Sequence, residues 1–389
     1  MGASEQTLLI DADFPGGNIV VERIEGDDCF VHQDLRDTTR DWFYWCFRVR
    51  NAQGRRLTFH FTQSNVLGVE GPAVSLDQGV TWRWLGDSCI QEKAFSYSFG
   101  LDEREVRFSF GMPYLEEHLA RFLTDHRQNQ FLRTETLCTS RKGRTVARIH
   151  IGCIHREPVA RVLLTCRHHC CEMMASYSLQ GLMQAVISNS EEFAWLRNNV
   201  EFLVVPFVDK DGVEDGDQGK MRHPHDHNRD YLGEPADSIY PEVRALREFV
   251  PKWSGGLLRV GLDLHCPYIR GAHNEVIYLV GSRSEQIAQQ QVLFGQLLES
   301  LAQGALPFRA EDYLPYGKAW NTAANYGSGR SFGNWLQDLS EVRLASTIEI
   351  PYARARQVEV NQETAQAFGQ DLGRAISAYL RSDPELVSK

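Results

Sequence analysis

From residue 116 onward, short apolar runs alternate with segments that have the spacing of amphipathic helices. The apolar runs predict buried strands at 162–166, 202–208, 259–265, 276–281 and 344–350. The helical spacing predicts helices at 116–127, 173–187, 242–249, 285–301 and 363–380. This alternation predicts an α/β domain built on one large mixed, mostly parallel sheet flanked by helices. Functional sites in such sheets gather at the carboxyl ends of the strands.

Residues 1–115 follow a different pattern, in which apolar and polar side chains alternate with a period of two. That period is typical of half-buried strands. Two apolar segments, 42–50 and 57–61, flank a turn at 51–54, which predicts a hairpin. The short, evenly spaced strands predict an antiparallel β-sandwich domain over 1–115, followed by the α/β domain over 116–389.

Composition excludes several classes of protein. The formal net charge of −10 offers no general basic surface, so we expect no nucleic-acid partner. No run of about 18 apolar residues is present, so we expect no membrane span. The N-terminus lacks the basic start and apolar stretch of a signal peptide, and the nine cysteines form no repeating framework. A cytoplasmic protein with reduced thiols is therefore expected. The sequence leaves its oligomeric state open.

Potential metal ligands follow two of the predicted strands. His169 and Glu172 form an H-x-x-E pair at the start of a helix, and His265 ends the strand 259–265. An imidazole and a carboxylate from one turn, with a second imidazole from another strand end, are normal zinc ligands that leave one position open. Four neighbouring residues could replace one of these ligands: His168, Cys170, Cys171 and Cys266. The three cysteines would more commonly be small buried packing groups.

The order of these residues resembles a known family. H-x-x-E is followed by Asn228-Arg229, then by His265, and finally by Glu349 in a late strand. Further fragments with the same order are WFYWCFRVRN, FSFGMPY, VVPFVDKDGV, DHNRDY, DLHCPY and STIEIPY. The set is similar to the M14 metallocarboxypeptidases, most of all to the cytosolic carboxypeptidase branch with its bacterial members. The resemblance implies one Zn²⁺ per chain, bound by His169, Glu172 and His265.

The resemblance also implies which side chains carry out the reaction. Glu349 would be the catalytic base, and a carboxylate in an apolar strand is costly to bury unless it is paired or used. Arg222 would polarise the scissile carbonyl, although the loop that carries it is shorter than the family pattern. Asp226 would support the first zinc histidine from behind. The chain departs from the family in having Cys170-Cys171 between its first two ligands.

A second group of residues is implied to bind the substrate. Asn228 and Arg229 would grip the C-terminal carboxylate of a peptide, and Tyr326, in a glycine-containing loop, would close over it. Arg330 could pair with an acidic side chain of the substrate, while Gly333, near the usual bottom of the specificity pocket, carries no charge. A preference for acidic C-terminal residues is therefore a hypothesis.

The sequence is compatible with three functions. The first is a zinc-dependent metallocarboxypeptidase that hydrolyses the C-terminal bond of peptides or protein tails. The second is a zinc amidohydrolase that removes the acyl group from N-acyl amino acids with the same metal set. The third is a binding protein with a decayed site. The N-terminal β domain disfavours the second function, and the complete set of expected catalytic residues disfavours the third.

Overall fold

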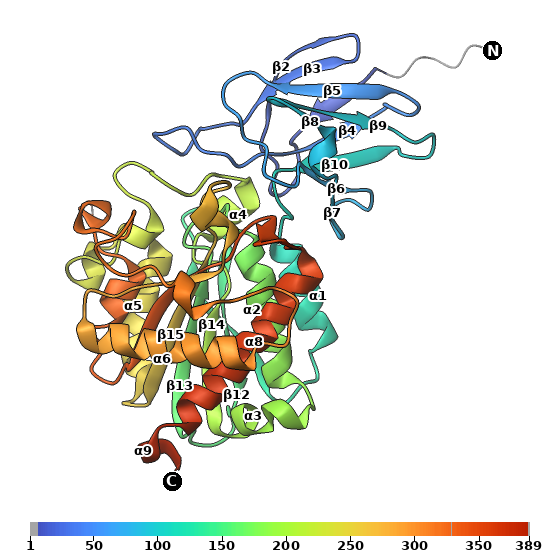
Figure 1. The fold of residues 1–389 in the computed structure, drawn as a ribbon. Coiled ribbons are helices and arrows are strands. Elements are labelled where there is room, and N and C mark those ends of the chain that lie inside the picture. Colours follow the sequence, from blue (N-terminus) through green and yellow to red (C-terminus); the bar gives the residue numbers. More distant parts are fainter. Residues whose placement is uncertain (1–6, 328, 388–389) are drawn as a thin grey trace.

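The structure, a computed structural model, describes residues 7–327 and 329–387. Figure 1 shows an N-terminal β lobe, in blue, stacked on one end of an α/β lobe, with the C-terminus at the far end. The last strand of the β lobe is β10 (Glu105–Ser109), and α1 (Glu116–Asp125) opens the second lobe. One hydrophobic cluster includes side chains from both lobes. Independent folding of 1–115 and 116–389 therefore stays a prediction.

The β lobe is a sandwich of two five-stranded sheets. The first has the order β1 (Leu9–Asp11), β4 (Cys46–Arg50), β10, β6 (Ala73–Ser75) and β7 (Arg83–Trp84). The second has the order β2 (Val20–Glu25), β3 (Asp28–His32), β5 (Arg56–Phe61), β9 (Ala94–Ser98) and β8 (Ile90–Gln91). Pairing is antiparallel except between β3 and β5. The predicted sandwich is confirmed.

The hairpin predicted around residues 51–54 is wrong. Its two strands, β4 and β5, belong to opposite sheets of the sandwich. Both have apolar inward faces, and Phe47 of β4 packs against Phe59 of β5 with ring centroids 5.2 Å apart. The connecting turn therefore crosses between the sheets, because this arrangement buries both apolar faces against each other.

The α/β lobe is built on a seven-stranded mixed sheet. Its order is β11 (Leu132–Thr139), β12 (Thr145–Gly152), β14 (Val200–Val205), β13 (Ala160–Cys166), β15 (Leu258–His265), β17 (Leu344–Glu349) and β16 (Tyr278–Val280). The four central strands, β14, β13, β15 and β17, run parallel to one another. The pairings β11–β12, β12–β14 and β17–β16 are antiparallel. The predicted mostly parallel sheet is confirmed, while β11 and β12 at its edge were not predicted.

Helices cover both faces of this sheet. Val162 and Leu164 of β13 belong to the cluster that includes α2 (Met174–Ile187) and α8 (Gln362–Arg381). Leu163 points the other way, into the cluster with α5 (Pro241–Ser254) and α7 (Phe332–Leu336). The remaining elements are α3 (Ala194–Asn199), α4 (Lys210–Asp215), α6 (Glu285–Leu301), α9 (Pro384–Val387) and the small pair β18 (Arg354–Ala355) and β19 (Val358–Glu359). Burial on both faces explains why the central strands are continuous apolar runs.

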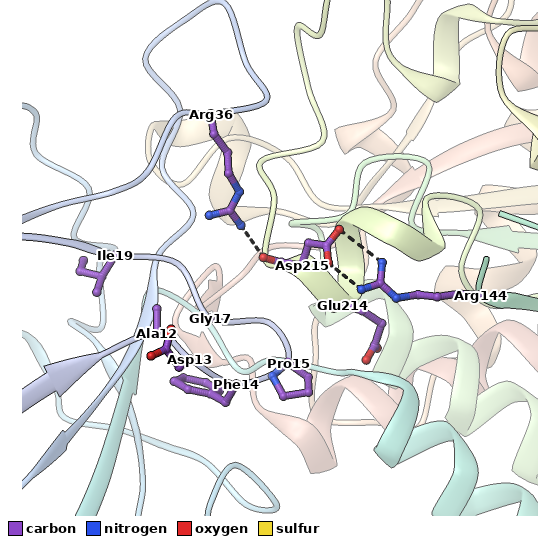
Figure 2. Close-up of a pocket in the computed structure, with 10 residues that line it drawn as sticks. All are labelled: Ala12, Asp13, Phe14, Pro15, Gly17, Ile19, Arg36, Arg144, Glu214 and Asp215. Atoms are coloured by element: carbon purple, nitrogen blue, oxygen red, sulfur yellow. Dashed lines mark hydrogen bonds and ion pairs between the residues drawn. The ribbon is translucent and has the colours of Figure 1, made fainter. Parts of the chain in front are cut away.

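The two lobes meet along a seam of polar contacts. A cavity of about 500 Å³ lies there, and the residues that line it are labelled in Figure 2: Ala12, Asp13, Phe14, Pro15, Gly17, Ile19, Arg36, Arg144, Glu214 and Asp215. Both of its arginines are bound to Asp215, since Arg144 Nη2 lies 2.6 Å from Asp215 Oδ1 and Arg36 donates to the Asp215 carbonyl. These contacts fix the start of the chain segment 215–222, which leads into the candidate site.

No helix in the described residues has the length and apolar character needed to cross a membrane.

Candidate metal centre and active site

The three predicted metal ligands converge at the carboxyl ends of β13 and β15. His169 Nδ1 lies 3.0 Å from Glu172 Oε1 and 3.1 Å from His265 Nδ1, and His265 Nδ1 lies 2.7 Å from Glu172 Oε2. All three side chains are buried. Burial lowers the pKa of His169 to about 4, which leaves its ring neutral and able to ligate at pH 7. Two imidazole nitrogens and a carboxylate facing one point fit a zinc ion with one open position.

The turn that carries His169 and Glu172 is held by a buried arginine. Arg167, directly after β13, has a φ of 61°, a conformation that side chains other than glycine rarely adopt. Its guanidinium donates to the Cys170 carbonyl and, at 2.8 Å, to the Tyr114 carbonyl. These bonds satisfy buried backbone oxygens and turn the chain so that both ligands face the end of β15.

Further carboxylates lie behind the ligand histidines. Asp263 Oδ2 is 2.5 Å from His265 Nε2, and its Oδ1 is 2.8 Å from His168 Nδ1. Such a contact fixes the orientation of a ligating ring, so Asp263 supports His265. The sequence held a signal for it, because positions 263 and 265 share one face of a strand. Asp226 Oδ1, predicted to support His169, lies 3.8 Å from His169 Nε2 and has no hydrogen-bond partner.

The rival ligands have other partners. His168 uses both ring nitrogens, the second lying 2.8 Å from the Tyr231 hydroxyl. Cys170 Sγ donates to the Asp217 carbonyl at 3.0 Å, and Cys171 Sγ lies 3.9 Å from the Tyr352 hydroxyl. Among the described residues, neither group of side chains able to hold a metal includes a cysteine. These cysteines therefore act as buried packing groups.

Glu349 lies beside the ligands, as the sequence predicted. It ends β17 and pairs in register with His265 at the end of β15. Its Oε2 is buried and has no hydrogen-bond partner. Burial raises the pKa of the Glu349 carboxyl to about 7, with Glu172 adding to the effect and His265 and Lys220 opposing it. A carboxyl with this pKa and a free oxygen is suited to accept and return a proton near neutral pH.

Arg222 has a different environment from the one its predicted role requires. Its guanidinium is bound by three carboxylates, at 2.9 Å from Asp37, 2.7 Å from Asp209 and 3.1 Å from Asp217. The cation that contacts a predicted ligand is Lys220, whose Nζ lies 2.9 Å from Glu172 Oε1. Lys220 could not be recognised from the sequence, because no motif distinguishes it from Arg222 two positions later.

The three carboxylates around its guanidinium make Arg222 a stabilising residue, so its loss is expected to lower the stability of the protein. Asp209 is buried, and three carboxylates without their cation would repel one another. We expect Arg222→Met to lower the free energy of unfolding by about 3–5 kcal/mol at pH 7. The loss should shrink at pH 5, because burial raises the pKa of Asp217 to about 6 and the carboxyl becomes protonated below it.

Urea denaturation at both pH values measures these changes. Arg309→Met is the matched control, because Arg309 forms an exposed pair with Glu299 at 3.2 Å, and it should change stability by less than about 1 kcal/mol. An Arg222→Met protein of unchanged stability that has lost its activity would contradict the stabilising role and restore the predicted catalytic one.

The predicted substrate-binding residues Asn228, Arg229 and Tyr326 lie close to one another. Asn228 and Arg229 lie in the 3₁₀ helix η3 (His227–Arg229), and Tyr326 ends the 3₁₀ helix η7 (Ala323–Tyr326). Asn228 Oδ1 accepts the Phe332 N–H at 3.0 Å, which leaves its amide nitrogen to donate. The Arg229 guanidinium lies 5.4 Å from the centre of the Tyr326 ring. Two donors and a tyrosine therefore stand together within reach of a ligand.

Arg330 is committed to partners of its own. It donates to the Asn334 carbonyl at 2.6 Å and forms an ion pair with Asp338. A different cation, Arg283, lines the pocket that also contains Tyr326, Gly333 and Thr347. Arg283 is exposed and forms no ion pair with any residue that the structure describes. Arg283 could not be recognised from the sequence, because it follows β16 without a recognisable motif.

Comparison with known proteins adds an independent line of evidence. The sequence profile of the family described as zinc carboxypeptidase matches residues 119–366. The chain is 26% identical over 321 residues to cytosolic carboxypeptidase 2 of Mus musculus, covering 73% of this chain and 36% of that protein. It is 23% identical over 421 residues to cytosolic carboxypeptidase 6 of Caenorhabditis elegans, covering 97% of this chain and 88% of that protein.

The fold also matches a solved structure. A metallo-carboxypeptidase from Burkholderia cenocepacia superposes with a TM-score of 0.77 at 20% identity, covering 97% of this chain and all of that one. The chain thus spans about a third of the mouse relative but the full length of the bacterial structure. Both lobes of the architecture are therefore shared with the bacterial protein.

Proposed function

Because this chain belongs to the zinc carboxypeptidase family, we propose that it hydrolyses the C-terminal peptide bond of peptides or protein tails. The observation that carries the proposal is the convergence of His169, Glu172 and His265 beside the unpartnered oxygen of Glu349. The predicted cytoplasmic location stays a prediction, supported by relatives that are named cytosolic carboxypeptidases.

In the proposed reaction, His169, Glu172 and His265 would hold about one zinc ion. A bound zinc ion supplies a polarised carbonyl and a water of lowered pKa. Glu349 takes a proton from the attacking water with its free carboxylate oxygen and then delivers it to the leaving amine. Asp263 keeps the His265 ring oriented during these transfers, while Asp226, 3.8 Å from His169, places a negative charge behind that ring.

The C-terminal position of the cut follows from the side chains around the ligands. Arg229 and the Asn228 amide would bind the terminal carboxylate of the peptide, and a guanidinium can do so through two parallel hydrogen bonds. Tyr326, packed on Arg229, would close over the bound residue. Holding the last residue in this way places only the terminal peptide bond beside Glu349.

A preference for acidic C-terminal residues is the finer part of the proposal. The candidate for this role from the sequence, Arg330, is already paired with Asp338. We therefore favour Arg283, which lines the pocket beside Tyr326 and forms no ion pair with any residue that the structure describes. A carboxylate entering this pocket would meet a positive charge, while an ammonium would be repelled.

Peptides that differ only in their last residue test this proposal. We expect kcat/KM to be at least about tenfold higher for C-terminal Glu than for Lys or Phe, and Arg283→Ala to remove most of that difference. Amidation of the C-terminus should stop the release. A preference for Lys or Phe would contradict the acidic pocket. Activity on N-acyl amino acids without activity on peptides would instead support the amidohydrolase function, and binding without turnover would support the decayed site.

A further inference from the structure

Lys220 occupies the position next to the metal ligands that a catalytic cation would need. Its Nζ lies 2.9 Å from Glu172 Oε1, and its side chain is 22% exposed. Its charge also acts on Glu349, whose pKa it lowers. An ammonium that contacts a candidate ligand, and whose charge acts on the base, borders the space where the scissile bond must lie in the proposed function.

The β lobe holds the loop that carries Lys220. The N–H groups of Gln218 and Gly219 donate to the two Asp37 oxygens at 2.9 and 2.8 Å. Gly219 has a φ of 75°, and a Cβ there would lie 2.4 Å from the Cys170 nitrogen, so only glycine fits. The Lys220 ammonium lies 5.2 Å from the Trp42 ring centre, a cation–π contact.

Arg222 cannot take the place of Lys220 beside the candidate ligands without breaking its bonds to three carboxylates. Nε, Nη1 and Nη2 each donate to a different carboxylate, those of Asp37, Asp209 and Asp217 respectively. Asp37 thus binds both the backbone before Lys220 and the guanidinium after it. One carboxylate of the β lobe fixes which of the two cations reaches the metal ligands.

We propose that Lys220, rather than Arg222, stabilises the negative charge that develops on the carbonyl oxygen of the scissile bond. The inference rests on the proposed function and assigns the residue that performs this step in this chain. Lys220 stays protonated throughout and forms no covalent bond. The ammonium interacts more strongly with the oxygen as its charge grows, so it lowers the barrier more than it strengthens substrate binding. The β lobe becomes part of the active site through Asp37 and Trp42.

Substitutions of Lys220 test the proposal in the zinc-loaded full-length protein. We expect Lys220→Met to lower kcat by about 10²–10³-fold while KM changes less than about threefold. Lys220→Arg, which keeps a charge of different shape, should recover part of kcat, and Lys220→Gln should recover little. Lys252→Met is the control, because Lys252 is exposed on α5, and it should behave as the wild type.

Binding measurements separate catalysis from a structural effect. A peptide phosphonate, which carries the negative oxygen of the transition state, should bind Lys220→Met more weakly by the same factor as kcat/KM falls. Zinc content and thermal stability should stay close to those of the wild type. Equal phosphonate affinity in wild type and Lys220→Met, or a loss of activity explained by lost zinc, would overturn the proposal. An inactive wild type would instead overturn the proposed function.

Discussion

Replacing His265 with alanine is expected to weaken zinc binding by at least about 100-fold and to remove detectable peptide hydrolysis. Loss of a residue that only orients a metal ligand typically weakens metal binding by about 10–100-fold, and loss of a ligand should weaken it more. His265 is itself a predicted ligand, with Nδ1 facing His169 and Glu172. His169→Ala should have the same effect, because each variant leaves two of the three protein ligands.

Elemental analysis of the purified proteins measures this result directly. We expect about one zinc per wild-type chain and almost none in either variant after dialysis against a weak chelator. His155→Ala is the control, since His155 is exposed and only contacts the Gln130 carbonyl at 2.6 Å. A wild type that stays metal-free after zinc is added would mean that the converging ligands are a relic, and the binding-protein function would then be preferred.

The metal ligands could be predicted because they depend on local rules. Strand ends on one edge of a parallel sheet meet, so a motif after β13 and a histidine ending β15 had to come together. The register between β15 and β17 then places Glu349 beside His265. Apolar periodicity predicted the strand ends, and the family resemblance in motif order selected the three ligands and Glu349 among the candidates there.

The cations could not be assigned in the same way. Whether Lys220 or Arg222 reaches the ligands is decided by Asp37, a residue more than 180 positions away in another lobe. The tertiary structure also decides that Arg330 pairs with Asp338, while Arg283 forms no ion pair with any residue that the structure describes. Side-chain direction in irregular loops depends on such distant contacts, which no spacing in the sequence encodes.

The same limit explains the strands that were missed. In β11, Leu132–Thr139, no residue is fully buried, because this strand lies at the edge of the sheet and much of it contacts solvent. Its partner β12, Thr145–Gly152, carries charged and polar residues between its apolar ones. Edge strands need less apolar character than central ones, so the rule that found β13 and β15 misses them.

Replacing Glu349 with glutamine is expected to lower kcat by about 10²–10⁴-fold while zinc stays bound. Glutamine keeps the size of the side chain but cannot accept the proton of the attacking water. The wild-type Oε2 has no hydrogen-bond partner, so the substitution breaks no existing bond at that atom. Glu248→Gln is the control, because Glu248 is exposed on α5. An unchanged kcat would exclude Glu349 as the base.

The same substitution should stabilise the metal-free protein at high pH. Burial raises the pKa of Glu349 from 4.5 to about 7, so the folded state holds this proton between those values while the unfolded state releases it. The contribution of Glu349 to stability is therefore fully present below about pH 4.5 and is lost as the pH rises through about 7. Glutamine has no charge to bury. Its free energy of unfolding relative to the wild type should increase by roughly 1–3 kcal/mol between pH 5 and pH 8.

Urea denaturation of the metal-free proteins at the two pH values measures that difference. A gain of stability at pH 8 combined with a loss of kcat would show that Glu349 destabilises the fold and is required for catalysis. Both effects are expected of a buried catalytic base. If the difference in free energy of unfolding between Glu349→Gln and the wild type were the same at pH 5 and pH 8, Glu349 would ionise at its ordinary pKa. Bound zinc, with its positive charge, should favour the ionised carboxylate and reduce the difference between the two proteins.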